Sequence, residues 1–576
     1  MYLSCGDCPQ NETACLSDHC VSADGQRRGI LTANRQLPGP VIQVCENDIL
    51  VVDVINRLPG KTAAMHWRGQ TQIETPHMDG APLVTQCPIP SYTTFQYKFR
   101  ASSAGTHLWH AHAGKQLIRS CANVQLRTIV TAEFVQFAGA DVTNGIFGAL
   151  IVKQADIKDP HRALYDIDDS NHVVLVSQWQ HSAEITFTDG HAKPAILLVN
   201  GRGRQPNGPN VPLTRFTVIP GRRHRFRVAN AGGAGSCPIT ISVDAHPLLL
   251  IALDGQPVEP RQIASITLAK GERADFVLKA NKRVAAYWMN VHTSKECAIS
   301  PINGAAILQY KGSSTKDPLS VAEATEQPEV EQVRVAMTTN PAGKCENPES
   351  LCVTELHALR KIPAALGKPK TDVTIRFYVA LYTSLNANIP KNVLAVLRGT
   401  TFRGADVSEE TIDATASDIC ECVHVRYIPL GATVEIILLD QGGLDDLVYH
   451  LHGYTFYVVG ARKFGRSVSL HELKSLDDKG QLFSRNLDCT VAKDTVVVPK
   501  FGAVALRFKA DNPGNTSFHA AEWTRGLDVI LQVGQTSDMV PAPEDFPKCG
   551  SFERNRGRSA TRLISAATSR FYRRKL

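Results

Sequence analysis

Short runs rich in Val, Ile, Leu, Phe and Thr recur along the whole chain, and each run ends at Gly, Pro, Asn or Asp. One run spans residues 49–55 and ends at Asn56, and others span residues 223–230 and 434–439. This pattern is typical of β-strands closed by turns, and stretches with a helical period are scarce. Because 576 residues are too many for one hydrophobic core, we predict an all-β protein built from several sandwich domains.

Two stretches with few large apolar residues divide the chain. Residues 311–333 are rich in Ser, Thr, Lys, Asp, Glu and Pro, and residues 153–169 contain many charges and Pro160. Such composition indicates exposed connections. The predicted segments are a Cys-rich start at 1–28, a first domain at 29–155, a second at 165–312, a connecting segment at 313–368, a third domain at 369–549 and a disordered tail at 550–576.

The formal net charge of +7 is concentrated in the tail. After Gly550 the chain has eight Lys and Arg residues against Glu553 alone, so the body of the protein is neutral. We interpret the tail as a solvated, mobile terminus rather than as a site for nucleic acid or anionic lipid, and expect no nucleic-acid partner. No apolar run is long enough for a transmembrane segment.

The 15 cysteines are spread without a repeated Cys-x-x-Cys pair, which favours disulfides over zinc sites. A small zinc knot is the alternative for the cluster at residues 5–20, but no partner recurs at finger spacing. Glycosylation sequons begin at Asn11 and Asn515. These features predict a secreted, extracellular glycoprotein. Residues after Met1 lack the regions of a signal peptide, so we expect that segment to be missing from this sequence.

Two His-x-His pairs are the main candidates for chemistry. His110 and His112 form the first pair, and His450 and His452 form the second. On a strand, alternate residues point to one face, so each pair presents two imidazoles together, and imidazole suits copper. The alternative is that each pair is an ordinary set of hydrogen-bonded strand residues. Two pairs far apart in sequence, each beside aromatic or glycine residues, favour a metal site.

These motifs resemble those of the multicopper oxidases, especially the laccase-like branch of arthropods. The resemblance runs over nearly the whole chain apart from the tail and one internal stretch. Its motifs are at residues 30–40, 78–80, 84–89, 105–112, 200–205, 220–226, 492–495, 511–514 and 546–549. It implies three cupredoxin-like (plastocyanin-like) Greek-key domains. It also implies a trinuclear copper cluster between the first and third domains, with a type 1 copper in the third.

The first two ligand motifs of the family are only partly preserved. His66 matches a type 2 ligand, but Arg68 stands where the family has a histidine for a type 3 copper. Arginine is cationic and has no lone pair for a metal. Its guanidinium is a candidate to replace the charge of a missing copper. The second motif is intact, with His110 and His112 at type 3 positions.

The last two motifs lack the type 1 ligands. Leu447 occupies the position of a type 1 histidine, whereas His450 and His452 match type 2 and type 3 ligands. His519 matches the first ligand of the fourth motif. The remaining altered ligand positions are Ala520, where the family has the type 1 cysteine, and Ala521, where it has a type 3 histidine.

Sorted by copper, the resemblance implies a partial site for up to two ions. The type 2 position keeps His66 and His450, one type 3 position keeps His112, His452 and His519, and His110 is the remnant of the second type 3 position. Type 1 copper is expected to be absent. The cysteine thiolate that would bind it and pass electrons on from it is also missing. We therefore predict a copper-binding homologue without laccase turnover, in which no residue is assigned a catalytic role.

Several alternatives stay open. Residues 117–143 form either an extra surface loop or intron read as coding sequence, and the short fourth motif is open to the same explanation. In that case the protein is an active oxidase of diphenols, ascorbate or metal ions. Without Cys121 the number of cysteines is even, as full disulfide pairing requires. The expected partner is an extracellular or matrix component of unknown identity, or a phenolic small molecule.

Overall fold

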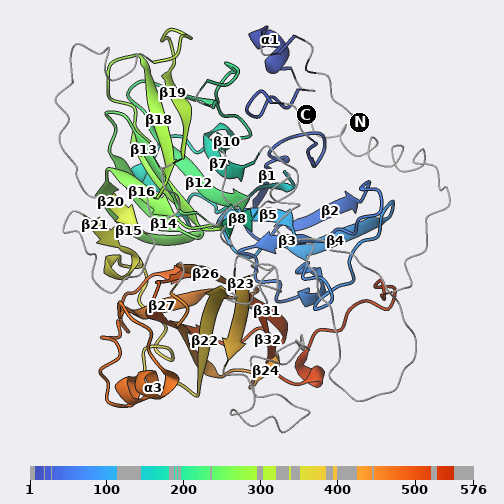
Figure 1. The fold of residues 1–576 in the computed structure, drawn as a ribbon, viewed down its shortest axis with the longest axis vertical. Coiled ribbons are helices and arrows are strands. Elements are labelled where there is room, and N and C mark those ends of the chain that lie inside the picture. Colours follow the sequence, from blue (N-terminus) through green and yellow to red (C-terminus); the bar gives the residue numbers. More distant parts are fainter. Residues whose placement is uncertain are drawn as a thin grey trace.

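The computed structural model shows an all-β protein, which confirms the predicted class. Three groups of sheets are seen in Figure 1: the first domain in blue at the right, the second in green at the upper left and the third in orange below them. The described residues are 5–112, 145–294, 302–383, 393–398 and 425–549, apart from gaps at 6, 9, 18–19, 27–28, 181–186, 189–190, 193–195, 206, 234–236, 319–335, 339–349, 444–445 and 521–527. The predicted insert at 117–143 and the predicted tail at 550–576 lie outside the described residues.

The first domain has two small sheets over one core. Its strands are β1 (Ile42–Cys45), β2 (Ile49–Ile55), β3 (Met65–Arg68), β4 (Thr94–Arg100), β5 (Gly105–Ala111) and β6 (Phe147–Lys153), in the orders β1-β6-β5-β3 and β2-β4. Phe95, Tyr97 and Phe99 alternate with exposed residues along β4. This period of two places one face of the strand in the core, where the Trp67 ring contacts Tyr97 and Phe99. The buried Trp67 thereby fixes β3, which carries the histidine of the first motif.

The second domain is the largest sandwich in the described part of the chain. Its strands are β7 (Val173–Trp179), β10 (Ile196–Val199), β11 (Arg215–Val218), β12 (Arg223–Gly233), β13 (Ile239–Val243), β14 (Leu248–Leu253), β15 (Gln256–Ile263), β16 (Ser265–Leu268), β17 (Arg273–Lys279), β18 (Ala286–Thr293), β19 (Asn303–Tyr310), β20 (Ala336–Thr338) and β21 (Ser350–Cys352), with a separate hairpin of β8 (Phe187–Thr188) and β9 (His191–Ala192). The sheet orders are β10-β7-β12-β17-β14-β15 and β11-β19-β18-β13-β16-β20-β21. β20 and β21 belong to the segment 313–368, so part of that predicted connection extends a sheet of this domain.

The third domain has two sheets and a short helix, α3 (Leu470–Asp478). Its strands are β22 (Val373–Thr383), β23 (Val393–Arg398), β24 (Val425–Ile428), β25 (Thr433–Asp440), β26 (Leu447–Leu451), β27 (Phe456–Lys463), β28 (Ala492–Lys493), β29 (Thr495–Val498), β30 (Gly502–Lys509), β31 (Gly514–Ala520) and β32 (Asp528–Val533). The orders are β23-β22-β25-β30-β27-β28 and β24-β32-β31-β26-β29. β25 is buried along its whole length because β22 and β30 flank it and the second sheet covers it.

Apolar contacts join the domains to one another. Leu108 and Phe147 of the first domain pack with Leu175 and Ala229 of the second in one buried cluster. Ala269 of the second domain packs with Val448 and Val497 of the third. The domain boundaries are therefore buried and apolar, and His66 of β3 and His450 of β26 meet across one of them.

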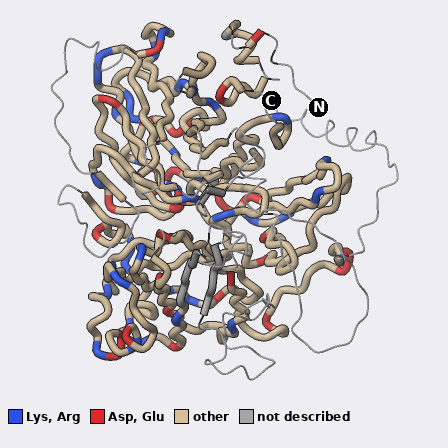
Figure 2. The backbone as a smooth tube through the Cα atoms, viewed as in Figure 1, with Lys and Arg blue, Asp and Glu red and all other residues tan. Residues whose placement is uncertain are grey.

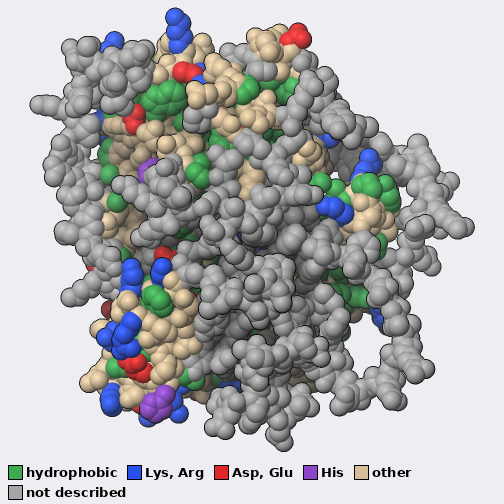
Figure 3. All heavy atoms as spheres, viewed as in Figure 1, with side chains coloured by type: hydrophobic (Ala, Val, Ile, Leu, Met, Phe, Trp, Pro, Cys, Tyr) green, Lys and Arg blue, Asp and Glu red, His purple; other side chains and the backbone are tan. Residues whose placement is uncertain are grey.

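Charge on the described surface is mixed in sign. In Figures 2 and 3, Lys and Arg gather around α3 at the lower left, and Asp and Glu lie among them. None of the helices in the described ranges combines the length and hydropathy that a membrane crossing requires.

Disulfides are found at both ends of the described chain. The pairs are Cys5–Cys20, Cys8–Cys15 and Cys87–Cys549, and Cys237 and Cys352 are also disulfide-bonded. This result agrees with the preference for disulfides over a zinc knot. Full pairing is wrong, however, because Cys45 and Cys489 are free. Cys45 is exposed on β1 and Cys489 is half-buried.

Candidate metal centre

Two neighbouring strands of the first domain carry half of the candidate site. β3 and β5 are antiparallel, and their register sets His66 opposite His110. Residues two apart on a strand share a face, so Arg68 lies on the same face as His66. His112 follows the end of β5, where its backbone N–H donates to the carbonyl of Ala64 at 2.8 Å. The predicted ligands of the first two motifs are thus placed on one surface.

The third domain supplies the other half. β26 lies between β29 and β31, with His450 opposite both Thr495 and His519. His452 follows the end of β26, and its backbone N–H donates to the carbonyl of Ser517 at 3.0 Å. Pairing of β26 with β31 therefore brings the third and fourth motifs together, although almost 70 residues separate them.

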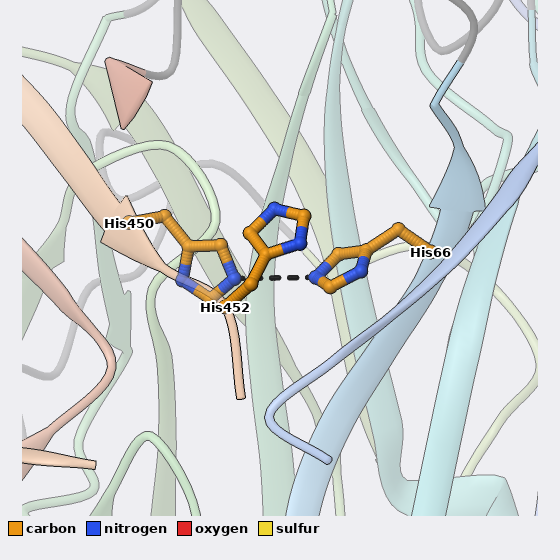
Figure 4. Close-up of side chains that lie close together, drawn as sticks. All are labelled: His66, His450 and His452. Atoms are coloured by element: carbon orange, nitrogen blue, oxygen red, sulfur yellow. Dashed lines mark hydrogen bonds between the residues drawn. The ribbon is translucent and has the colours of Figure 1, made fainter. Parts of the chain in front are cut away.

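The imidazoles from the two domains converge in one buried pocket. His66 Nε2 lies 3.2 Å from His450 Nε2, as the dashed line in Figure 4 shows, and the His452 ring stacks on His66 with centroids 3.7 Å apart. His452 Nε2 lies 3.0 Å from His519 Nε2. The ring of His112 is 5.0 Å from that of His452, and the ring of His110 is 5.6 Å from that of His112.

In five of these histidines the Nδ1 atom faces an oxygen acceptor outside the cluster. The pairs are His66 Nδ1 with the Asp79 carbonyl at 2.8 Å, His450 Nδ1 with the Asp494 carbonyl at 2.8 Å, His452 Nδ1 with Asp79 Oδ2 at 2.7 Å, His519 Nδ1 with the Ala520 carbonyl at 2.7 Å and His110 Nδ1 with the Ala111 carbonyl at 2.9 Å. A carbonyl or carboxylate oxygen can only accept, so Nδ1 carries the proton in each ring. Each Nε2 therefore presents a lone pair to the pocket.

Two such lone pairs facing each other at 3.0–3.2 Å repel unless a cation lies beside them. A proton is a poor candidate, because burial lowers the pKa of His452 to about 4, opposed by the nearby Asp79. Burial also holds the pKa values of His110, His112, His450 and His519 well below the usual value, and neighbouring histidines or Arg68 lower them further. The arrangement fits a metal ion. Imidazoles are suitable ligands when an oxygen acceptor at Nδ1 fixes the orientation of the ring.

The pocket contains two groups of three histidines that could each hold an ion. One is His66, His450 and His452, and the other is His112, His452 and His519. The second group has the membership that the sequence predicts for one type 3 position. In the first group His452 lies beside the two predicted type 2 ligands. His110 lies at the edge of the pocket and belongs to neither group.

Arg68 reaches from the first domain into the third. Its Nη2 donates to Thr495 Oγ1 at 2.7 Å, and it is 5% exposed. Burial lowers its pKa to about 10, opposed chiefly by Asp494, so the guanidinium remains charged at neutral pH. The site therefore contains a buried cation beside the histidines.

Several site residues escaped the sequence analysis. Asp79 accepts from His452, and the Asp494 carboxylate receives two bonds from the Arg273 guanidinium, at 2.7 and 2.5 Å. Lys493 is 2.9 Å from Asp254 and 3.2 Å from Glu272. The motifs at 78–80 and 492–495 contained Asp79 and Asp494, but only the fold reveals that their partners come from other domains.

The positions expected for type 1 ligands lie in a hydrophobic core. Leu447 and Ala520 are buried in the main core of the third domain, together with Tyr449 and Phe518. Neither offers a donor atom to copper. Ala521 lies outside the described residues, and the loss of type 1 copper stays a prediction.

Comparison with known proteins identifies the family. Sequence profiles described as multicopper oxidase match residues 16–133, 169–313 and 390–526, more than half of the chain. Laccase-4 of Thanatephorus cucumeris is 26% identical over 92% of this chain and 89% of its own length, and laccase-1 of Fomitopsis schrenkii is 28% identical over 92% and 86%. These relatives are fungal, so the arthropod branch stays a prediction.

Solved structures with the same fold support this result. Fet3p, a multicopper oxidase that functions in iron import, superposes with a TM-score of 0.66 at 20% identity, covering 91% of this chain and 90% of its own. The laccase of Botrytis aclada gives a TM-score of 0.64 at 22% identity, with 90% and 86% covered. Such proteins have three cupredoxin-like domains, as predicted. The chain belongs to the multicopper oxidase family.

Proposed function

We propose that this protein is a secreted copper-binding member of the family that does not oxidise diphenols as a laccase does. The observation that carries the proposal is the set of Nε2 lone pairs that converge across the boundary between the first and third domains. His66 and His450 would hold one ion, and His112, His452 and His519 would hold another. Copper bound there would supply one-electron redox chemistry.

The chain's own residues prepare the ligands. Asp79 accepts from His452 Nδ1 at 2.7 Å, and the Asp494 carbonyl accepts from His450 Nδ1 at 2.8 Å. These bonds fix the tautomer and the ring orientation. The apolar surroundings of Leu447 and Ala520 supply no thiolate or imidazole through which a phenol's electron would enter. Disulfides at both ends of the described chain support an extracellular location.

An active oxidase is the second candidate. It is favoured by the match to laccases over about 90% of their length together with six surviving histidines in one pocket. The two proposals differ in whether a blue type 1 copper is present. They also differ in whether oxygen is consumed with a phenol.

The test is metal analysis and oxygen uptake on the purified full-length chain, with a fungal laccase as positive control. We expect up to two copper ions per chain, no blue thiolate-to-copper absorption and no oxygen uptake with a diphenol. Blue protein that consumes oxygen would establish the oxidase instead. A chain that retains no copper after dialysis against a weak chelator would contradict both proposals.

Single substitutions in the pocket test the two ligand sets separately. His452 is one of the three ligands proposed for the second ion, and its Nε2 can bind only one ion because its Nδ1 is bonded to Asp79. His452→Ala should therefore weaken copper binding at that position, by about 100-fold or more, and His66→Ala should weaken binding at the other position. Competition titrations with a copper indicator measure both constants. His224→Ala, which removes a buried histidine of the second domain, is the matched control, and an equal loss in that variant would show that the effect is on folding.

A further inference from the structure

Arg68 lies beside the proposed ligands and is held there by contacts from all three domains. It shares a face of β3 with His66, and its Nη2 bonds Thr495, the cross-strand neighbour of His450. Gly271 of the second domain closes over it: a Cβ at that position would lie 2.5 Å from Arg68 Cζ, and φ there is +80°. Glycine at this position leaves room for the guanidinium next to the pocket, and a side chain there would displace it.

The charges around the pocket nearly balance. The buried charged groups that act on Arg68 are Arg273, Asp254, Glu272 and Asp494. The cluster also contains Lys493, which pairs with Asp254 and Glu272, and Asp79, which contacts His66 and His452. Most are engaged with one another: Arg273 bonds Asp494, and Lys493 lies between Asp254 and Glu272. With neutral histidines, this cluster has one net negative charge, which one monovalent cation would neutralise. Without Arg68 the cluster would have two net negative charges, which one divalent cation would neutralise.

We propose that Arg68 makes the histidine pocket favour monovalent over divalent cations, so that copper held there is favoured as the cuprous ion. The inference rests on the proposed metal-binding function. The repulsion between Arg68 and a bound ion is proportional to the charge of the ion. The guanidinium therefore disfavours a divalent ion twice as strongly as a monovalent ion at the same place.

The donor atoms agree with this preference. Both groups consist of imidazole donors alone, and the Asp79 carboxylate contacts imidazole nitrogens rather than the interior of the pocket. Sets of two or three neutral nitrogen donors suit the low coordination numbers of a cuprous ion. A divalent ion would require more donors or a negative ligand for the same stabilisation.

The experiment compares redox-inert ions of different charge on the full-length protein. Dissociation constants are measured for Ag⁺ and Zn²⁺ with the wild type, Arg68→Met and Arg68→Lys, after free thiols such as Cys45 are alkylated. We expect Arg68→Met to bind Ag⁺ about tenfold and Zn²⁺ about 100-fold more tightly, because the change in log Kd should double with ion charge. Arg68→Lys keeps the charge and should stay near the wild type.

Controls separate this inference from the proposed function. Arg100→Met removes a partly exposed arginine of the first domain that pairs with Glu74, and it should change neither constant. If Arg68→Met does not fold, Arg68→Gln serves instead, since it keeps a polar side chain for Thr495. Equal changes for the two ions, or no change, would overturn the inference while leaving the metal site intact. If the wild type bound neither Ag⁺ nor Zn²⁺, the proposed metal-binding function itself would be refuted.

Discussion

Metal-free protein will unfold cooperatively as the pH falls from about 6 to about 4. Burial lowers the pKa values of His107 and His452 to about 4, and the pKa values of His110, His112, His450 and His519 lie well below their usual value. In the unfolded chain each histidine takes up a proton near pH 6.5. At pH values between the native and the unfolded pKa of these histidines, the unfolded state binds more protons than the native state. Lowering the pH therefore favours unfolding.

The sign and the size follow from proton linkage. A depressed histidine pKa gives stability that is fully present above pH 6.5 and is lost as the pH falls towards the native value, at about 1.4 kcal/mol per pH unit for each proton. Two buried carboxyls oppose this, because burial raises the pKa of Asp440 to about 6 and of Asp528 to about 8. For the six histidines named above and these two carboxyls, a net uptake of about four protons would change the free energy of unfolding by roughly 5 kcal/mol per pH unit, comparable to the whole stability of a domain. His224 and His246, whose pKa values burial also lowers to about 4, add to this slope.

Denaturant titrations at several pH values, with a chelator present, measure this slope. His107 is buried beside the Ser103 carbonyl and is not a proposed ligand, so His107→Gln should reduce the slope by about 1.4 kcal/mol per pH unit. A stability that stays constant from pH 7 to pH 4 would contradict the neutral, buried state of these rings.

Loss of the Cys87–Cys549 disulfide will destabilise the protein by about 5 kcal/mol. The bond links the first domain to the end of the third domain, across 462 residues. In the chain-entropy treatment, a cross-link that closes so long a loop restricts the unfolded state more than a short one does. Cys549→Ser should therefore lower the denaturation midpoint of the oxidised protein.

The matched variant is Cys8→Ser, which opens a loop with a sequence separation of only 7 in the small N-terminal cluster. Its effect should be clearly smaller, because the loop is short and lies outside the three sandwiches. Equal effects of the two variants would show that native contacts, not the length of the closed loop, determine the contribution of the Cys87–Cys549 bond.

The fold was predictable because the strand signal is local. Alternation along residues 94–100 is visible in the sequence and reappears as the buried Phe95, Tyr97 and Phe99. The strands at 336–338 and 350–352 were missed because they are short and lie among polar residues; β20 is stabilised by pairing with β16, and β21 by pairing with β20. Their strand state depends on a neighbour that is distant in sequence.

The site was predictable only in its ligands. His450 and His452 stand out because the motif is compact, and their faces follow from the strand period. The contact between Arg68 and Thr495 joins residues 427 apart, and the pairing of Cys87 with Cys549 is equally remote. No local pattern encodes such partners, so these contacts depend on domain packing.

The division of the pocket between two domains has a consequence for biosynthesis. The first domain contributes His66 and His112, and His519 is supplied by β31 near the other end of the described chain. While the protein is being synthesised, neither half alone offers either three-histidine group. Metal loading is therefore expected to be a late, post-translational event, and proteolytic fragments that contain only one of these domains should be released without their metal.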